Sequence, residues 1–137
     1  MKKFIPIALA AAALVLAVGC AAEKKAESDS DFKGVYIEIT QEEAKEMMKK
    51  DDGHLIVDVR RQDEYDEGHI PDAVCIPNES IGTEQPEELP DKEQILLIYC
   101  RSGRRSKQAA QKLADIGYTN IYEFGGIIDW TGEIVTN

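Results

Sequence analysis

The segment from Cys100 to Ser106, Cys-Arg-Ser-Gly-Arg-Arg-Ser, holds the residue types best suited to covalent chemistry in this chain. It directly follows the apolar run from Ile95 to Tyr99 and directly precedes an amphipathic helical pattern. A cysteine between a strand and a helix start lies where backbone N–H groups and the helix dipole favour an anion. Three arginines and two serine hydroxyls share the segment. These residues predict a reactive thiolate at Cys100 that acts on an anionic substrate.

The other residues of this segment suit the binding of an anion near the sulfur. Gly103 allows the positive φ that a curled loop of N–H groups requires. Arginine side chains attract a dianion and stabilise a leaving anion, although Arg104 falls within the helical pattern, where a solvated role is the alternative. Ser106 either donates to the sulfur or caps the helix. We expect substrate-binding roles around catalytic Cys100 for Arg101, Ser102, Gly103, Arg104, Arg105 and Ser106.

Alternating strand and helix patterns must position this segment. Helical patterns begin at Thr40, which forms a capping box with Glu43, and at Arg104. Short strand patterns lie over residues 34–39, 55–59, 73–76, 95–99 and 120–124. This alternation predicts an α/β domain with a mostly parallel central sheet flanked by helices. Ligands of such sheets bind beyond the carboxyl ends of the strands, where Cys100 lies.

The N-terminal segment predicts export. Lys2 and Lys3 precede an apolar run over residues 5–18 that is short for a membrane-spanning helix. The run ends in Gly19-Cys20 and resembles the signal of bacterial lipoproteins, in which the cysteine receives lipid. The resemblance implies a signal peptide over residues 1–20, lipidation at Cys20 and a membrane-anchored protein on the periplasmic or extracellular face. An ordinary signal peptide with an incidental Cys20 is the alternative.

The composition of the chain indicates its domain organisation and its partners. Residues 21–31 are small and charged and predict a flexible linker, which leaves residues 32–137 for one domain. The net charge of −10 excludes a nucleic-acid partner and favours a small anion at the basic Cys100 segment. We expect no cofactor, and no metal because His69 has no second ligand at metal spacing. If Cys20 carries lipid, Cys75 and Cys100 remain as thiols, and their pairing as a disulfide is open.

Three groups of residues, in order along the chain, resemble signatures of the single-domain rhodaneses, a family of sulfurtransferases. The segment from Tyr99 to Ser106 resembles the active-site loop of that family. Gly125-Gly126 with Trp130 resembles its C-terminal signature. The first signature is matched by Asp58-Val59-Arg60, Glu64-Tyr65, Gly68-His69-Ile70, Ala73 and Ile76-Pro77. Two positions depart from the family pattern: Asp72 stands where Gly is common, and Cys75 stands where Asn is common.

This resemblance implies a rhodanese-like domain and a two-step reaction. Cys100 takes the outer sulfur from a donor such as thiosulfate and becomes a persulfide, and an acceptor such as cyanide or a thiol removes that sulfur. Four residues of the first signature are expected to form the framework of the site: Asp58, Arg60, Glu64 and His69. Arg60 and Glu64 are four positions apart and predict an ion pair. Asp58 is expected to accept hydrogen bonds near the loop.

Three other functions also use a cysteine in such a loop or a pair of thiols. Cysteine phosphatases and arsenate reductases place an arginine six residues after the cysteine, whereas here that position is Ser106 and Arg105 comes fifth. The shorter loop from Cys100 to Arg105 suits the larger sulfur atom and favours sulfur transfer over phosphate chemistry. A non-catalytic sulfur carrier or docking module would keep the same persulfide. A redox pair of Cys75 and Cys100 requires Cα atoms within about 7 Å of each other.

Overall fold

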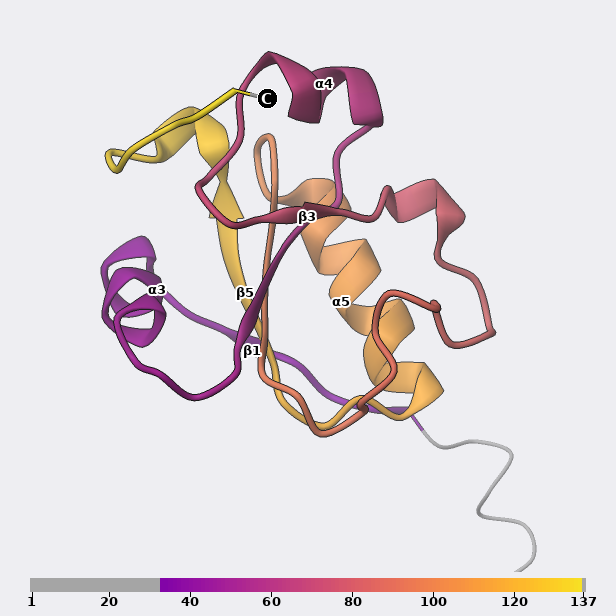
Figure 1. Cartoon of the computed structure of the whole chain (residues 1–137). Coiled ribbons are helices and arrows are strands. Elements are labelled where there is room, and N and C mark those ends of the chain that lie inside the picture. The colour runs from indigo at the N-terminus through magenta and orange to yellow at the C-terminus, as the bar shows by residue number, and fades with distance from the viewer. Residues whose placement is uncertain (1–32, 137) are drawn as a thin grey trace, which may run out of the picture. The chain divides into compact units, whose positions relative to one another are not determined.

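A five-stranded parallel sheet with the strand order β1-β5-β4-β2-β3 forms the centre of the fold (Figure 1). The computed structural model describes residues 33–136, so the predicted signal peptide, the predicted linker and Cys20 lie outside the described residues. The strands are β1 (Ile37–Glu38), β2 (Leu55–Asp58), β3 (Val74–Cys75), β4 (Leu96–Cys100) and β5 (Ile121–Gly126). The prediction of an α/β fold with a parallel sheet is confirmed.

Helices cover both faces of the sheet. Helix α3 (Gln41–Met48) lies on one face and α5 (Arg104–Ile116) lies on the other (Figure 1). A third helix, α4 (Gln62–Glu67), follows β2, and two 3₁₀ turns cover Asn78–Ser80 and Ile127–Asp129. None of the helices among residues 33–136 is long and apolar enough to span a membrane.

The central strand β4 is buried on both sides, which explains its unbroken apolar sequence. Because successive side chains of a strand point to opposite faces, Ile98 and Cys100 pack on the α5 side. Leu97 and Tyr99 pack on the α3 side, where Ala44 of α3 also lies. The catalytic candidate therefore ends the central strand and faces the helix that follows it.

The helix ends follow the sequence prediction closely. Thr40 Oγ1 accepts from the Glu43 N–H at 3.0 Å, and the Glu43 carboxylate accepts from the Thr40 N–H at 2.8 Å. This reciprocal pair confirms the capping box at the start of α3. Helix α5 ends at Ile116, and Gly117 adopts a φ of 119° there, in the left-handed region that favours glycine.

The strand ends differ from the prediction. Strand β1 covers Ile37–Glu38 rather than residues 34–39, because it is an edge strand whose ladder pairs only with Tyr122 and Glu123 of β5. Strand β5 continues to Gly126, two residues beyond the predicted end. The glycines that were expected to follow the last strand therefore belong to it.

Candidate active site

The sulfur of Cys100 lies at the carboxyl end of β4 and accepts a backbone hydrogen bond from the loop that follows. The Gly103 N–H donates to Cys100 Sγ at 3.0 Å. Gly103 has a φ of 109°, as the sequence analysis expected for a curled loop, and α5 begins at the next residue, Arg104. The N-terminal end of α5 and an aimed N–H thus face the sulfur, which is an arrangement that favours an anion. The Cys100 side chain is 1% exposed.

The Gly125-Gly126 pair holds this loop from the side of β5. Gly126 pairs with Cys100 across the sheet, after a bulge that lies between the pairs Ile98–Glu123 and Cys100–Gly126. A Cβ atom at Gly126 would lie 2.0 Å from the carbonyl oxygen of Arg101, so only glycine fits. The Ile128 N–H donates to the same oxygen at 3.1 Å. The C-terminal signature therefore packs directly against the cysteine loop.

The three arginines of the loop divide into two kinds. Arg105 donates two hydrogen bonds to the carboxylate of Glu64, at 2.7 and 3.1 Å. These bonds lower the pKa of Glu64 to about 2 and raise the pKa of Arg105. Arg101 and Arg104 are exposed, and neither forms an ion pair with any residue between 33 and 136. Arg105 thus joins α4 to α5, and Arg101 and Arg104 carry the free positive charge.

A cavity of about 470 Å³ adjoins the loop. Four of the side chains around it are cationic, although Arg105 is paired with Glu64 and Arg61 with Asp63. Arg61 was missed by the sequence analysis; its only signal was its position just after β2. The lining residues are Arg61, Asn78, Glu79, Arg101, Ser102, Arg104, Arg105 and Gln108. The excess of positive charge makes this cavity suitable for a small anion.

Asp58 and Arg60 form a buried ion pair at the carboxyl end of β2, beside the strand that ends at Cys100. Arg60 donates to Asp58 through Nε at 2.9 Å and through a terminal nitrogen at 2.7 Å, and it also donates to the Gly68 carbonyl oxygen at 2.7 Å. The predicted ion pair between Arg60 and Glu64 is therefore wrong. The spacing rule requires one continuous helix, whereas Arg60 lies between β2 and α4 and turns back toward Asp58.

Tyr99 connects this ion pair to the strand of the cysteine. Its hydroxyl donates to Asp58 at 2.6 Å and accepts from the Ile70 N–H at 3.1 Å. Burial, together with the charge of Asp58, raises the pKa of Tyr99, so the hydroxyl keeps its proton. Asp58 thus accepts hydrogen bonds close to the loop, as the sequence analysis expected.

His69 lies in the framework rather than beside the sulfur. Its ring stacks on that of Tyr65 with 3.8 Å between the ring centroids, and its backbone exchanges hydrogen bonds with Val135. Within residues 33–136, no cluster of three or more His, Cys, Asp or Glu side chains is arranged to hold a metal ion. Packing and backbone pairing account for the burial of this histidine.

Comparison with known protein families matches residues 40–133 to the rhodanese-like domain. The chain belongs to this family. It is 37% identical, over 75% of its length and 94% of the relative, to the thiosulfate sulfurtransferase GlpE of Coxiella burnetii. It is 34% identical to the putative sulfur carrier protein YrkF of Bacillus subtilis, over 80% of this chain and 59% of that protein. A crystal structure of a rhodanese-like domain protein from Staphylococcus aureus superposes with a TM-score of 0.63, at 31% identity, over 74% and 98% of the two chains.

Ser106 has a different partner in this rhodanese-like domain from either of those expected. Its hydroxyl is fully buried and donates to the carboxyl group of Glu123. Gly103 rather than Ser106 occupies the N-cap of α5, so Ser106 neither caps the helix nor donates to the sulfur. The sequence analysis missed Glu123, whose only signal was an acidic residue within an otherwise apolar strand. Its contact with Ser106 depends on how α5 packs on β5.

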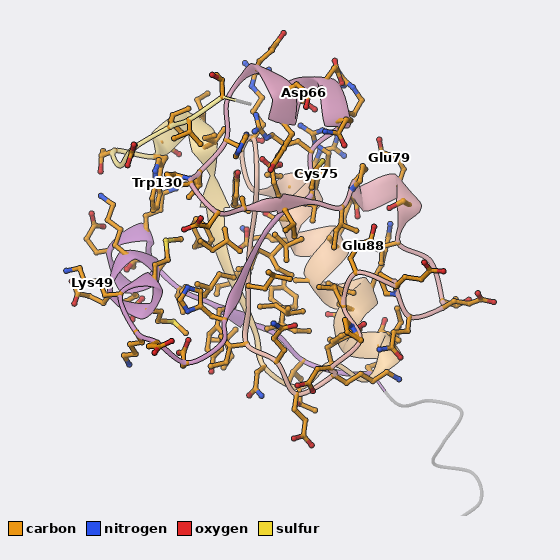
Figure 2. All side chains as sticks on the ribbon, in the orientation of Figure 1. Lys49, Asp66, Cys75, Glu79, Glu88 and Trp130 are labelled. Carbon is orange, nitrogen blue, oxygen red and sulfur yellow. The ribbon has the colours of Figure 1, made fainter. Side chains whose placement is uncertain are left out.

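Cys75 lies on the outer strand β3 (Figure 2), and β2 separates that strand from β4, which ends at Cys100. Asp58 of β2 pairs with both Cys75 and Tyr99, so two strand spacings of about 4.8 Å separate Cys75 from the strand of Cys100. That separation exceeds the Cα distance of about 7 Å that a disulfide allows, and both thiols are free. Burial, together with the charge of Asp58, raises the pKa of Cys75 to about 11, so its thiol is a weak nucleophile.

Proposed function

We propose that this protein is a sulfurtransferase that moves sulfane sulfur from an anionic donor such as thiosulfate to a thiophilic acceptor through a persulfide on Cys100. The observation that carries the proposal is the hydrogen bond of 3.0 Å from the Gly103 N–H to Cys100 Sγ at the start of α5. A backbone donor in that position stabilises a thiolate and, after transfer, a persulfide anion. The unpaired arginines Arg101 and Arg104 supply the charge that attracts the donor.

In the first half of the reaction, the Cys100 thiolate attacks the outer sulfur of thiosulfate. The new bond between the two sulfur atoms forms as the sulfur–sulfur bond of the donor breaks, and sulfite leaves with the electron pair. Arg101 and Arg104 lie where they would neutralise the charge of the donor and of the departing sulfite. The proton of the Cys100 thiol passes to solvent before the attack.

In the second half, cyanide or a thiolate attacks the outer sulfur of the persulfide. The bond from that sulfur to Cys100 Sγ breaks, and the Cys100 thiolate leaves with the electron pair. The products are thiocyanate or a new persulfide, and the enzyme returns to its first state. The Gly103 N–H donates to Cys100 Sγ in the structure and would stabilise that sulfur as a thiolate before and after the cycle.

The relatives support this assignment and leave one alternative. GlpE is named a thiosulfate sulfurtransferase, and the similarity covers 94% of its length. YrkF is named a putative sulfur carrier protein, and the match covers 59% of it. A carrier would form the same persulfide but would hand the sulfur to a partner protein rather than turn over with small molecules. The arginine-lined cavity favours a small anionic donor and hence the enzyme.

The mass of the purified protein after incubation with thiosulfate tests the proposal. We expect a gain in mass of one sulfur atom that disappears on addition of cyanide. With both substrates present, each protein molecule should form many molecules of thiocyanate. Cys100→Ser should take up no sulfur, whereas Cys75→Ser serves as the matched control and should behave as the natural protein. A persulfide without multiple turnovers would favour the carrier, and an adduct that persists in Cys100→Ser would disprove the role of Cys100.

We also propose that the protein is exported and anchored to a membrane through lipid on Cys20. The support is the order of the N-terminal residues, in which Lys2 and Lys3 precede an apolar run that closes at Gly19-Cys20. The charged segment over residues 21–31 would then separate the rhodanese-like domain from the lipid surface.

A further inference from the structure

Glu123 is a buried carboxyl group on β5, next to the segments that flank the cysteine loop. It pairs in register with Ile98 and is 2% exposed on the sheet face that α5 covers. Burial of such a group lowers stability unless its polar atoms are paired in hydrogen bonds or an ion pair. The positions of its partners show what this carboxyl group does.

The carboxyl group contacts both segments that flank the cysteine loop. Its Oε2 accepts from the Ser106 hydroxyl in the first turn of α5 and from the Gly125 N–H at 3.0 Å. Its Oε1 lies 3.5 Å from Lys107 Nζ. A serine hydroxyl has one proton to donate, and Glu123 is its shortest partner, so the carboxyl group sets the direction of that bond.

The contacts with Ser106 and Gly125 are both connected to the cysteine loop through the backbone. Ser106 Oγ lies 3.0 Å from the carbonyl oxygen of Gly103, the residue whose N–H donates to Cys100 Sγ. On the other side, Gly125 precedes Gly126, which packs against the backbone of Arg101. The bulge in β5 turns the Gly125 N–H back toward Glu123. One buried side chain thus fixes both supports of the loop that aims the Gly103 N–H.

We propose that Glu123 is a positioning residue for sulfur transfer. By accepting hydrogen bonds from Ser106 and Gly125, it holds the loop in the geometry that directs the Gly103 N–H at Cys100 Sγ. This inference rests on the proposed function for its kinetic consequence. Glu123 does not line the cavity that holds Arg101 and Arg104, so it acts on the transfer step rather than on donor binding.

Two uncharged variants separate the hydrogen bonds of Glu123 from its charge. Glu123→Gln removes the charge but keeps the length of the side chain and one acceptor oxygen. Glu123→Leu removes both the charge and the acceptor and introduces an apolar side chain. We expect Glu123→Leu to lower kcat about 10- to 100-fold and to leave KM for thiosulfate within about twofold. Glu123→Gln should recover most of the lost kcat. Circular dichroism and thermal unfolding establish that each variant is folded.

If Glu123→Leu does not fold, Ser106→Ala provides the second test, because alanine removes the hydroxyl and suits a helix. We expect the same fall in kcat with unchanged KM. The proposal is overturned if the folded variants keep the natural kcat, if KM rises in place of the fall in kcat, or if Glu123→Gln loses as much as Glu123→Leu.

A separate measurement distinguishes this inference from the proposed function. If the natural protein takes up no sulfur from thiosulfate, the proposed function fails. The alkylation rate of Cys100 by iodoacetamide, measured in a Cys75→Ser background, still reports the positioning. We expect alkylation to be severalfold slower in Glu123→Leu than in Glu123→Gln, because both lack the charge and only the first lacks the acceptor. Equal rates would overturn the inference.

Discussion

The ion pair between Glu64 and Arg105 offers a direct test of how α4 and α5 are held together around the site. Glu64 lies in the first turn of α4 and Arg105 in the first turn of α5, and the two side chains form two hydrogen bonds of 2.7 and 3.1 Å. Glu64→Gln removes the charge and keeps an oxygen that can accept from the Arg61 N–H, as Glu64 does at 3.1 Å. The variant therefore perturbs the ion pair and preserves the start of α4.

The size of the effect follows from the pKa of Glu64. The hydrogen bonds from Arg105 lower that pKa from 4.5 to about 2, which means that folding favours the ionised form. The side chains of Glu64 and Arg105 keep 16% and 22% of their exposure, so solvent screening reduces the benefit below what the shift alone suggests. We expect Glu64→Gln to lower the free energy of unfolding at pH 7 by about 1–2 kcal/mol.

The pH dependence has a defined sign. Because the pKa of Glu64 is lower in the folded state, its stabilisation is complete above about pH 4.5 and is lost as the pH falls toward 2. The natural protein and Glu64→Gln should therefore converge in stability between pH 4.5 and 2. Urea denaturation at pH 7, 4 and 2.5 measures this difference.

Asp63→Asn is the matched control, since the ion pair of Asp63 with Arg61 is exposed. We expect a much smaller change for this variant at every pH. Equal stability of Glu64→Gln and the natural protein at pH 7 would show that this ion pair does not hold α4 to α5. A difference in stability that did not shrink between pH 4.5 and 2 would contradict the lowered pKa of Glu64 in the same way.

Three further predictions concern charge, backbone strain and export. Arg101→Ala and Arg104→Ala should each lower kcat/KM for thiosulfate at least about fivefold, with a rise in KM, because each removes a positive charge from the cavity. Steady-state kinetics at low salt measure this, and an unchanged KM in both variants would argue against donor binding there. Asp72 has a φ of 69°, so Asp72→Gly should raise the free energy of unfolding by about 0.5–1 kcal/mol in urea, and a loss of stability would contradict this. Cys20→Ser should move the protein from the membrane fraction to the soluble fraction, and continued recovery in membranes would reject the lipid anchor.

The features that depend on nearby residues were predictable from the sequence. The capping box joins Thr40 and Glu43, and the positive φ of Gly103 serves a loop of only a few residues. The alternation of apolar strands and amphipathic helices depends on local periodicity, and it predicted the parallel sheet. Asp72 shows the same principle, because the family prefers glycine at a position that proves to have a positive φ.

The contacts that depend on packing between distant segments were not predictable. Arg105 and Glu64 are 41 residues apart, and they meet only because α4 and α5 begin at the same edge of the sheet. The pairing of Ser106 with Glu123 requires α5 to pack on β5, and no local pattern in the sequence predicts that contact. The predicted ion pair between Arg60 and Glu64 was wrong because helical spacing was applied across the end of a strand.

The protein is acidic overall, and the pairing of its arginines explains why the cavity beside the cysteine loop is nevertheless positively charged. Arg60 is paired with Asp58, and Arg105 is paired with Glu64. These two ion pairs connect segments of the fold and contribute no net charge. Arg101 and Arg104 lack such partners among the described residues and line the cavity beside the loop that follows Cys100. Among the arginines of residues 33–136, the two without a carboxylate partner therefore both lie where the donor would approach. The net charge of −10 would repel a polyanion that extends beyond the cavity, whereas a small dianion inside it would be attracted by Arg101 and Arg104.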